Sequence, residues 1–242
     1  MSSVSLSLTR RVVAEGTGTA LLLATVVGSG IMGERLSGGS VGLALLANTL
    51  ATGAALVALI LTFGPISGAH FNPVVTLSAA WERGLPWREA PVYIGAQVLG
   101  AVLGVFAAHV MFALPVAQVS QHVREGRAQM FSECVATFGL LAVIWGCSRV
   151  KAAVVPFAVG AYITAAYWFT ASTSFANPAV TLARALTDTF AGIRPEDVPG
   201  FILAQLVGAA GATALFHWML PPTPSVAADV VLAHPALPEE SP

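Results

Sequence analysis

The chain has 242 residues, of which 56% are hydrophobic and only 10% are charged, and its mean hydropathy is +0.78. Soluble domains carry roughly 25% charged residues, so the composition argues against a water-soluble globule and favours a membrane protein. The formal net charge is −1 and the single lysine is Lys151, which argues against a nucleic-acid partner.

Six apolar windows follow one another along the chain, and each approaches the roughly 20 residues that a helix needs to cross about 30 Å of hydrocarbon. They cover residues 12–32, 41–63, 91–112, 130–146, 154–170 and 198–219. The first window follows two arginines, as a signal peptide does, but it is too long for one and contains Glu15, so we expect a spanning helix. Residues 221–242 accumulate proline and acidic residues, and this tail is expected to lack fixed structure.

Three segments of the first half recur in the second half in the same order. The segment "AEGTGTALLL" around Glu15 matches "SECVATFGLL" around Glu133, and "YIGAQVLGA" matches "FILAQLVGA". Between them, Asn-Pro-x-Val-Thr-Leu occurs at Asn72 and again at Asn177. Each half has three spanning windows, an odd number, so the second half must enter the membrane from the opposite side. We therefore predict an all-α membrane protein with one domain over residues 1–220 and inverted repeats at about 11–112 and 129–219.

The two Asn-Pro motifs open helices that are too short to cross a membrane. Residues 72–81 and 177–187 each supply about ten residues, or roughly 15 Å of helix. Asparagine is a good N-cap, and proline (Pro73 and Pro178) is favoured at the first helical position. The irregular backbone that precedes each motif is tolerated at membrane depth only where it is buried in protein or lines water. The motifs thus predict two half-helices whose N-termini meet at the centre of the membrane.

Two meeting N-termini would concentrate partial positive charge and disfavour cations, including hydronium. If the side-chain oxygens of Asn72 and Asn177 cap their own helices, only N–H donors remain for the lumen. A water that accepts from both cannot also accept from a neighbouring water, so a proton-conducting chain would be broken there. The alternative is that both asparagines merely cap buried turns.

These residues resemble the aquaporin and glycerol-facilitator (major intrinsic protein) family over residues 11–219. The resemblance rests on "SGAHFNPVVTL", "NPAVTLA" and the paired glutamates and glutamines. It implies six transmembrane helices plus two re-entrant half-helices, a homotetramer in the lipid bilayer with one pore per subunit, and passive conduction of small neutral solutes without a cofactor. It also implies that Glu15 and Glu133 accept backbone hydrogen bonds from the re-entrant loops; a proton relay through them is the alternative.

The chain departs from the family pattern at two positions. The first motif has Val74 where alanine is usual, whereas the second motif keeps Ala179. Val180 occupies the place of an arginine that usually belongs to the outer constriction. The family spacing places three further residues in that constriction, namely Thr52, Ala165 and Ser174.

A ring of Thr52, Ala165, Ser174 and Val180 would be wider than a water-selective filter and would contain no fixed guanidinium. We therefore expect passage of water, glycerol and undissociated metalloid acids such as arsenite. The chain resembles bacterial members that lack this arginine, including channels associated with arsenic handling, so a bacterial inner membrane is the expected location.

Several residues allow two interpretations. Val180 could face a neighbouring helix, and Arg184 could add charge to the vestibule, although we expect a solvated or interface arginine there. His70 could line the inner pore or be structural. His109 and His217 have no second ligand at metal spacing, so no metal site is expected. Close helix packing is expected at five glycines: Gly95, Gly100, Gly104, Gly208 and Gly211.

Three other functions are compatible with parts of this pattern. An ordinary water-selective channel would differ only in its filter. An ion-coupled secondary transporter also uses inverted repeats with broken helices, but the expected pore residues include no carboxylate cluster. A membrane scaffold with a closed pore is the third. An enzyme is not expected, because no nucleophile–base pair or ligand cluster is recognisable.

Overall fold

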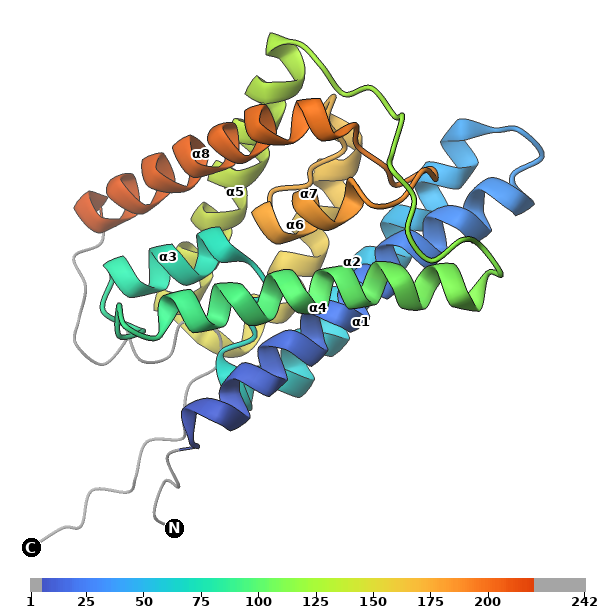
Figure 1. Ribbon diagram of the computed structural model, residues 1–242. Helices are drawn as coiled ribbons and strands as arrows, with labels where there is room; N and C mark the ends of the chain where they lie inside the picture. The colour runs from blue at the N-terminus through green and yellow to red at the C-terminus, as the bar shows by residue number, and fades with distance from the viewer. Residues whose placement is uncertain (1–5, 220–242) are drawn as a thin grey trace, which may run out of the picture.

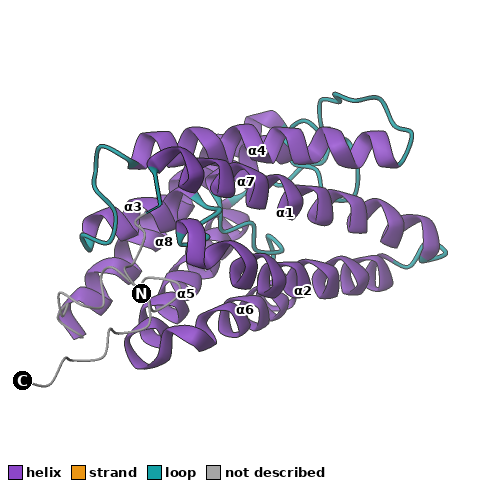
Figure 2. Cartoon of the chain, turned by 90° about the horizontal axis from the view of Figure 1, so that it is seen from below, coloured by secondary structure: helices purple, strands orange, loops and turns teal. Residues whose placement is uncertain are grey.

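The computed structural model describes residues 6–219, and the predicted tail at 221–242 lies outside them. Within this range every regular element is helical, and loops join the helices (Figure 2). The α-helices are α1 (Leu8–Leu36), α2 (Val41–Ser67), α3 (Pro73–Trp81), α4 (Ala90–Met111), α5 (Arg127–Lys151), α6 (Val155–Phe169), α7 (Pro178–Arg184) and α8 (Val198–Met219).

The six predicted crossings correspond to α1, α2, α4, α5, α6 and α8, so the predicted all-α membrane fold is confirmed. By length and composition, five continuous helical stretches of the described chain can cross a membrane. One of them, Arg127–Phe169, contains both α5 and α6, which are joined by the 3-10 turn Ala152–Val154 and pack against each other. This stretch therefore supplies two of the six long helices.

The helices form two sets of four that are arranged alike. In the first set α1 packs against α2 and α4, and in the second set α5 packs against α6 and α8. Each short helix contacts both sets: α3 packs on α4 and also on α8, and α7 packs on α8 and also on α4. Both short helices thus lie inside the bundle, between the long helices (Figure 1).

Glycine permits the closest of these helix contacts. A Cβ atom on Gly104 of α4 would overlap the carbonyl oxygen of Ala20 in α1, and one on Gly208 of α8 would overlap that of Cys134 in α5. The expectation for Gly95 is wrong, because a Cβ there would meet no described atom within 4 Å. Gly95 lies on α4 but outside its contact with α1.

The outward faces of the long helices carry large apolar side chains. Such an extended apolar exterior is unusual for a soluble monomer and is what a hydrocarbon environment requires. Examples from four helices are Leu50, Leu99, Leu103, Phe157 and Leu203. Polar side chains are instead found in the interior, where Glu15, Gln97, Glu133 and Gln205 are fully buried.

Candidate functional site

The two asparagines cap the short helices as predicted. Asn72 Oδ1 accepts from the backbone N–H of Val74 at 3.1 Å. Asn177 Oδ1 accepts from the N–H groups of Ala179 and Val180 at 3.0 and 3.3 Å. A proline follows each asparagine at the first helical position, where its missing N–H costs nothing. The side-chain oxygens are therefore engaged with their own helices.

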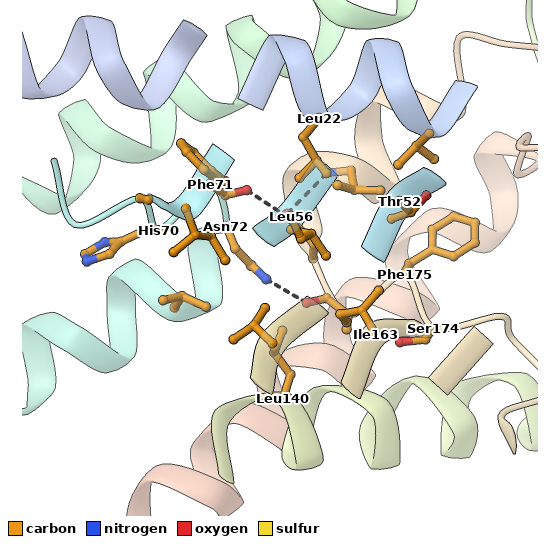
Figure 3. A pocket seen from close by; sticks show the side chains of 18 of the residues that line it. Leu22, Thr52, Leu56, His70, Phe71, Asn72, Leu140, Ile163, Ser174 and Phe175 are labelled. Atoms are coloured by element: carbon orange, nitrogen blue, oxygen red, sulfur yellow. Dashed lines mark hydrogen bonds between the residues drawn. The ribbon is translucent and has the colours of Figure 1, made fainter. Parts of the chain in front are cut away.

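The amide nitrogens link the two halves of the molecule. Asn72 Nδ2 donates to the carbonyl oxygen of Ala176, and Asn177 Nδ2 donates to that of Phe71, both at 2.8 Å. The bond from Asn72 is drawn in Figure 3. These bonds bring the N-termini of α3 and α7 together. Since each amide group has two hydrogens, one hydrogen on each asparagine remains for a molecule in the lumen.

The chain approaches each asparagine in the same unusual conformation. The backbone is left-handed at Ala69 and Phe71 (φ 48° and 49°) and at Ser174 and Ala176 (φ 49° and 48°). These are the positions three and one residues before each asparagine. For residues with a Cβ atom this conformation costs roughly 1–3 kcal/mol each and requires support from the surroundings.

Glu15 supplies this support in the first half. Its carboxylate accepts from the N–H groups of His70 and Phe71 at 2.9 and 2.8 Å. Ser67 Oγ and Gln97 Nε2 donate to the same carboxylate at 2.7 and 2.8 Å. A buried carboxylate with this many donors is well satisfied.

Glu133 has the equivalent position in the second half. Its carboxylate accepts from the N–H groups of Phe175 and Ala176, both at 2.8 Å, and from Gln205 Nε2 at 2.6 Å. The expected bonds to both loops are thus present. Neither glutamate lines the central cavity, which favours the structural interpretation over a proton relay.

A cavity runs past both asparagines through the centre of the bundle. Its wall is mostly apolar and comes from α1, α2, α5 and α6: Leu22, Val26, Leu56, Ile60, Leu140, Ile144, Val159 and Ile163. Polar groups occur at its middle and towards its two ends. Figure 3 shows His70 on one side of Asn72, and Thr52, Ser174 and Phe175 on the other. We call these two sides the His70 end and the Arg184 end.

Three of the four predicted filter residues, Thr52, Ser174 and Val180, line this cavity. The prediction for Ala165 is wrong, because that residue is exposed on the opposite side of α6. Tyr167 lines the cavity instead, and its hydroxyl donates to Thr52 Oγ1 at 3.4 Å. Helical periodicity explains the error: residues four apart share a face, and α6 lines the cavity with Val159, Ile163 and Tyr167.

Arg184 also differs from our expectation of a solvated or interface arginine. Its side chain is only 2% exposed and lines the cavity. Nε donates to the carbonyl oxygen of Ala191, and Cζ lies 3.4 Å from the ring centroid of Phe175. Arg184 follows Val180 by one helical turn, which places both side chains on one face of α7. The Arg184 end therefore does contain a fixed guanidinium.

A second arginine packs on the same aromatic ring. Arg124, from the loop between α4 and α5, has its Cζ 4.9 Å from the Phe175 centroid. Its Nε donates to Gly192 O at 2.8 Å and its Nη1 to Ser172 O at 3.2 Å. Burial lowers the pKa of Arg124 to about 10, so this guanidinium is charged at pH 7. No sequence signal marked Arg124, because it lies in a loop remote from both motifs.

Val74 does not face the cavity. It lines a separate groove between α3 and α8, together with Leu77 and Trp81 among others. The valine that replaces the usual alanine therefore does not narrow the cavity. Pro73, Pro178 and Ala179 are buried in the short helices and shape the cavity only through the backbone.

His70 and His109 have protein partners. His70 lines the cavity, and its Nδ1 is 3.1 Å from Thr76 Oγ1. His109 contacts Val116 O and Thr187 Oγ1 at 2.8 and 2.7 Å, which ties the end of α4 to the two adjoining loops. Within residues 6–219, no cluster of three His, Cys, Asp or Glu side chains is suited to a metal ion.

Comparison with known proteins agrees with this geometry. The family model "Major intrinsic protein" matches residues 2–163. The aquaglyceroporin AqpS of Rhizobium meliloti (strain 1021) is 57% identical over 215 residues, which cover 89% of this chain and 92% of AqpS. The aquaporin NIP6-1 of Arabidopsis thaliana is 33% identical over 58% of this chain and 45% of its own length.

The X-ray structure of the aquaglyceroporin from Plasmodium falciparum has the same fold. It superposes with a TM-score of 0.67 at 21% identity and covers 91% of this chain and 99% of its own. The fold of the described helices thus has its counterpart in a known architecture, and the family model and the identity to AqpS show that the chain belongs to the major intrinsic protein family.

Proposed function

We propose that this protein is a passive transmembrane channel for small uncharged solutes, broader in selectivity than a water channel. The observation that carries the proposal is the apolar-walled cavity that passes both asparagine caps and lacks an arginine at Val180. Glycerol and undissociated metalloid acids such as arsenite are the leading solutes, and water passes as well. The 57% identity to a protein named an aquaglyceroporin supports the same solute range.

The chemistry of the cavity suits neutral, hydroxylated molecules. Its apolar walls offer few groups that could replace the water molecules around an ion, so the cost of desolvation strongly opposes the passage of ions. At the midpoint, the free amide hydrogens of Asn72 and Asn177 are donors only, and a hydroxyl or water oxygen can accept from them. The N-termini of α3 and α7 add positive potential that opposes cations.

Family membership supports a proposal for the assembly and the location. We propose a homotetramer in the cell membrane, the inner membrane if the source is a bacterium such as that of AqpS, with one pore in each subunit. The apolar exterior of the long helices would then face lipid on some sides and neighbouring subunits on others. We propose no enzymatic activity.

Two alternatives make different flux predictions. A strictly water-selective channel would conduct water but not glycerol. An ion-coupled transporter would show saturable flux that depends on an imposed proton or sodium gradient. The absence of a carboxylate among the residues that line the described cavity supports the channel over the transporter.

The first prediction concerns Val180→Arg, measured in liposomes by swelling or uptake with water, glycerol and arsenous acid. A guanidinium at this position would narrow the ring and stand one turn from Arg184. We expect the glycerol and arsenous acid permeabilities to fall at least about tenfold, with water permeability changed less. Val74→Ala is the matched control, since Val74 faces the groove between α3 and α8, and it should conduct like the wild type.

Wild-type solute flux should rise linearly with the concentration gradient and need no ion gradient. Saturable, ion-dependent flux would contradict the channel. Equal solute flux in wild type and Val180→Arg would remove Val180 from the constriction.

A further inference from the structure

Two residues at the Arg184 end of the cavity have polar side-chain atoms without a hydrogen-bond partner among residues 6–219. Ser174 Oγ is buried without a hydrogen-bond partner among residues 6–219, and Ser174 as a whole is 3% exposed. Arg184 forms its hydrogen bond through Nε; within the described chain its two terminal nitrogens form none. Both residues line the cavity, so a molecule that enters this end of the cavity lies next to them.

The two arginine side chains at this end of the cavity, Arg184 and Arg124, have no paired carboxylate among residues 6–219. Two guanidiniums therefore contact the Phe175 ring without direct neutralisation. Buried polar groups are normally hydrogen-bonded, so unsatisfied donors of this kind indicate a position where a ligand or water oxygen binds.

The orientation of the guanidinium is fixed by its neighbours. Stacking on Phe175 sets the plane, and the bond from Nε to Ala191 O sets the rotation within that plane. A guanidinium held in this way presents its remaining N–H groups as a rigid fork, which matches two oxygens on one small molecule better than a single oxygen. Across the same end, the Thr52 and Tyr167 hydroxyls add two further polar groups to the cavity.

We infer that Arg184 and Ser174 form a solute-recognition site for small neutral molecules that carry two or more hydroxyl groups. The guanidinium fork donates to two solute oxygens, and Ser174 Oγ accepts from a solute hydroxyl. Arg184, one helical turn after Val180, thus supplies hydrogen-bond donors that the Val180 side chain lacks. The inference rests on the proposed channel function, and it specifies which neutral solutes pass most readily.

The test is the ratio of solute to water permeability in proteoliposomes. The probes are glycerol and boric acid, which are neutral polyhydroxyl molecules at pH 7, and urea, which is of similar size but has no hydroxyl. For Arg184→Met we expect glycerol and boric acid permeabilities to fall about tenfold, urea to fall less than about threefold, and water to stay within about twofold. Arg184→Lys keeps the charge but not the fork, so its losses should be intermediate.

Ser174→Ala removes the hydroxyl while keeping the Cβ atom. It should lower glycerol and boric acid permeability about threefold, and the double variant should lose less than the product of the single losses, because both groups bind the same solute. Arg194→Met is the matched control: it removes an arginine from a loop at the same end, but Arg194 pairs with Glu125 and Asp197 outside the cavity. It should leave all four permeabilities unchanged.

A purely structural role for Arg184 would lower water, urea and glycerol permeability together, and that result would overturn the inference. An unchanged or higher glycerol-to-water ratio in Arg184→Met would overturn it too. If Arg184→Met does not fold, Arg184→Lys and Ser174→Ala decide by the same ratio. Wild-type protein that conducts no glycerol would refute the proposed function itself, whereas a wild type that conducts glycerol, together with variants whose glycerol-to-water ratio is unchanged, would refute only this site.

Discussion

At the scale of single residues, Asn72 and Asn177 divide their hydrogen bonds among three tasks. The oxygen of each side chain caps its own helix, one amide hydrogen crosses to a carbonyl of the other half, and the second hydrogen is left for the lumen. An aspartate could perform the first task but neither of the others, because an ionised carboxylate only accepts. The amide is therefore the chemical requirement at this position.

This requirement gives a prediction for Asn177→Asp. The variant keeps the cap but loses the donor to Phe71 O, and it places a carboxylate beside that buried carbonyl. We expect a loss of about 1–3 kcal/mol in stability, together with a proton or cation leak that the wild type lacks. Thermal unfolding in detergent and a pH-sensitive dye in liposomes would measure the two effects.

Asn72→Asp should behave in the same way, because its bond to Ala176 O is equivalent. Gln118→Glu makes the same chemical change at an exposed loop amide and serves as the control. If both asparagine variants remained as proton-tight and as stable as the Gln118 variant, the amide would not be essential.

Sequence reasoning singled out Asn72, Asn177, Thr52, Ser174 and Val180, and the structure places all five at the cavity. Four of them lie in or beside the two short motifs, whose backbone geometry determines where their side chains point. Sequence reasoning failed at Ala165 and Arg184 for two physical reasons. A register error of two residues on a helix turns a side chain to the opposite face. The burial of Arg184 depends on Phe175 and on the Ala191 carbonyl, and such long-range packing leaves no local pattern in the sequence.

At the scale of elements, apolar windows predicted which segments are helices better than they predicted where the helices end. Capping groups set several helix ends. Ser7 accepts a hydrogen bond from the first turn of α1, which begins before the apolar window at residues 12–32. Ser40 accepts one from the first turn of α2, which begins where the window at residues 41–63 begins. The second short helix ends at Arg184, three residues before its predicted end at Thr187. Polar contacts at the ends, which hydropathy does not register, account for these differences.

The contact between α1 and α4 gives a prediction at this scale. Gly104→Ala would push a methyl group into the Ala20 carbonyl and Leu23 of α1, and overpacking of this kind costs about 1–3 kcal/mol. We expect a lower unfolding temperature in detergent and less correctly assembled protein.

Gly95→Ala is the matched control on the same helix. A Cβ atom at Gly95 meets no described neighbour within 4 Å, and alanine has a higher helix propensity than glycine by about 1 kcal/mol. This variant should be as stable as the wild type or slightly more stable. Equal stability of the Gly104 and Gly95 variants would show that the α1–α4 contact tolerates an additional methyl group.

At the scale of the whole molecule, the repeat read from the sequence corresponds to equivalent contacts in the two sets of helices. The symmetry is chemical as well as geometric, because Glu15 and Glu133 hold the two loops with matching bonds. The polar ends of the cavity do not follow the repeat: His70 lies at one end, and Arg184 with Arg124 lies at the other. Internal repetition could therefore predict the scaffold, whereas the polar groups at the two ends of the cavity differ and do not follow from the repeat.

Besides the asparagine bonds at the centre, a buried ion cluster joins the two halves towards one face of the bundle. Glu82, just after α3, accepts from Arg149 of α5 at 3.3 Å and lies 2.9 Å from His217 Nδ1 of α8. Arg149 also donates to Phe216 O at 3.1 Å. The Glu82 side chain is only 3% exposed, so its charge depends on these partners.

Glu82→Gln should weaken the connection between the halves. The substitution leaves the Arg149 guanidinium, whose side chain is 11% exposed, without its carboxylate, and breaking a largely buried pair costs about 3–5 kcal/mol. We expect about 2–4 kcal/mol here, since some solvent reaches Arg149, seen as a lower unfolding temperature in detergent. Glu125→Gln is the matched control, because the Glu125 side chain is 68% exposed and pairs with Arg194; exposed pairs contribute about 0–1 kcal/mol. Similar unfolding temperatures for the two variants would mean that the Glu82 carboxylate adds no measurable stability to the connection between the halves.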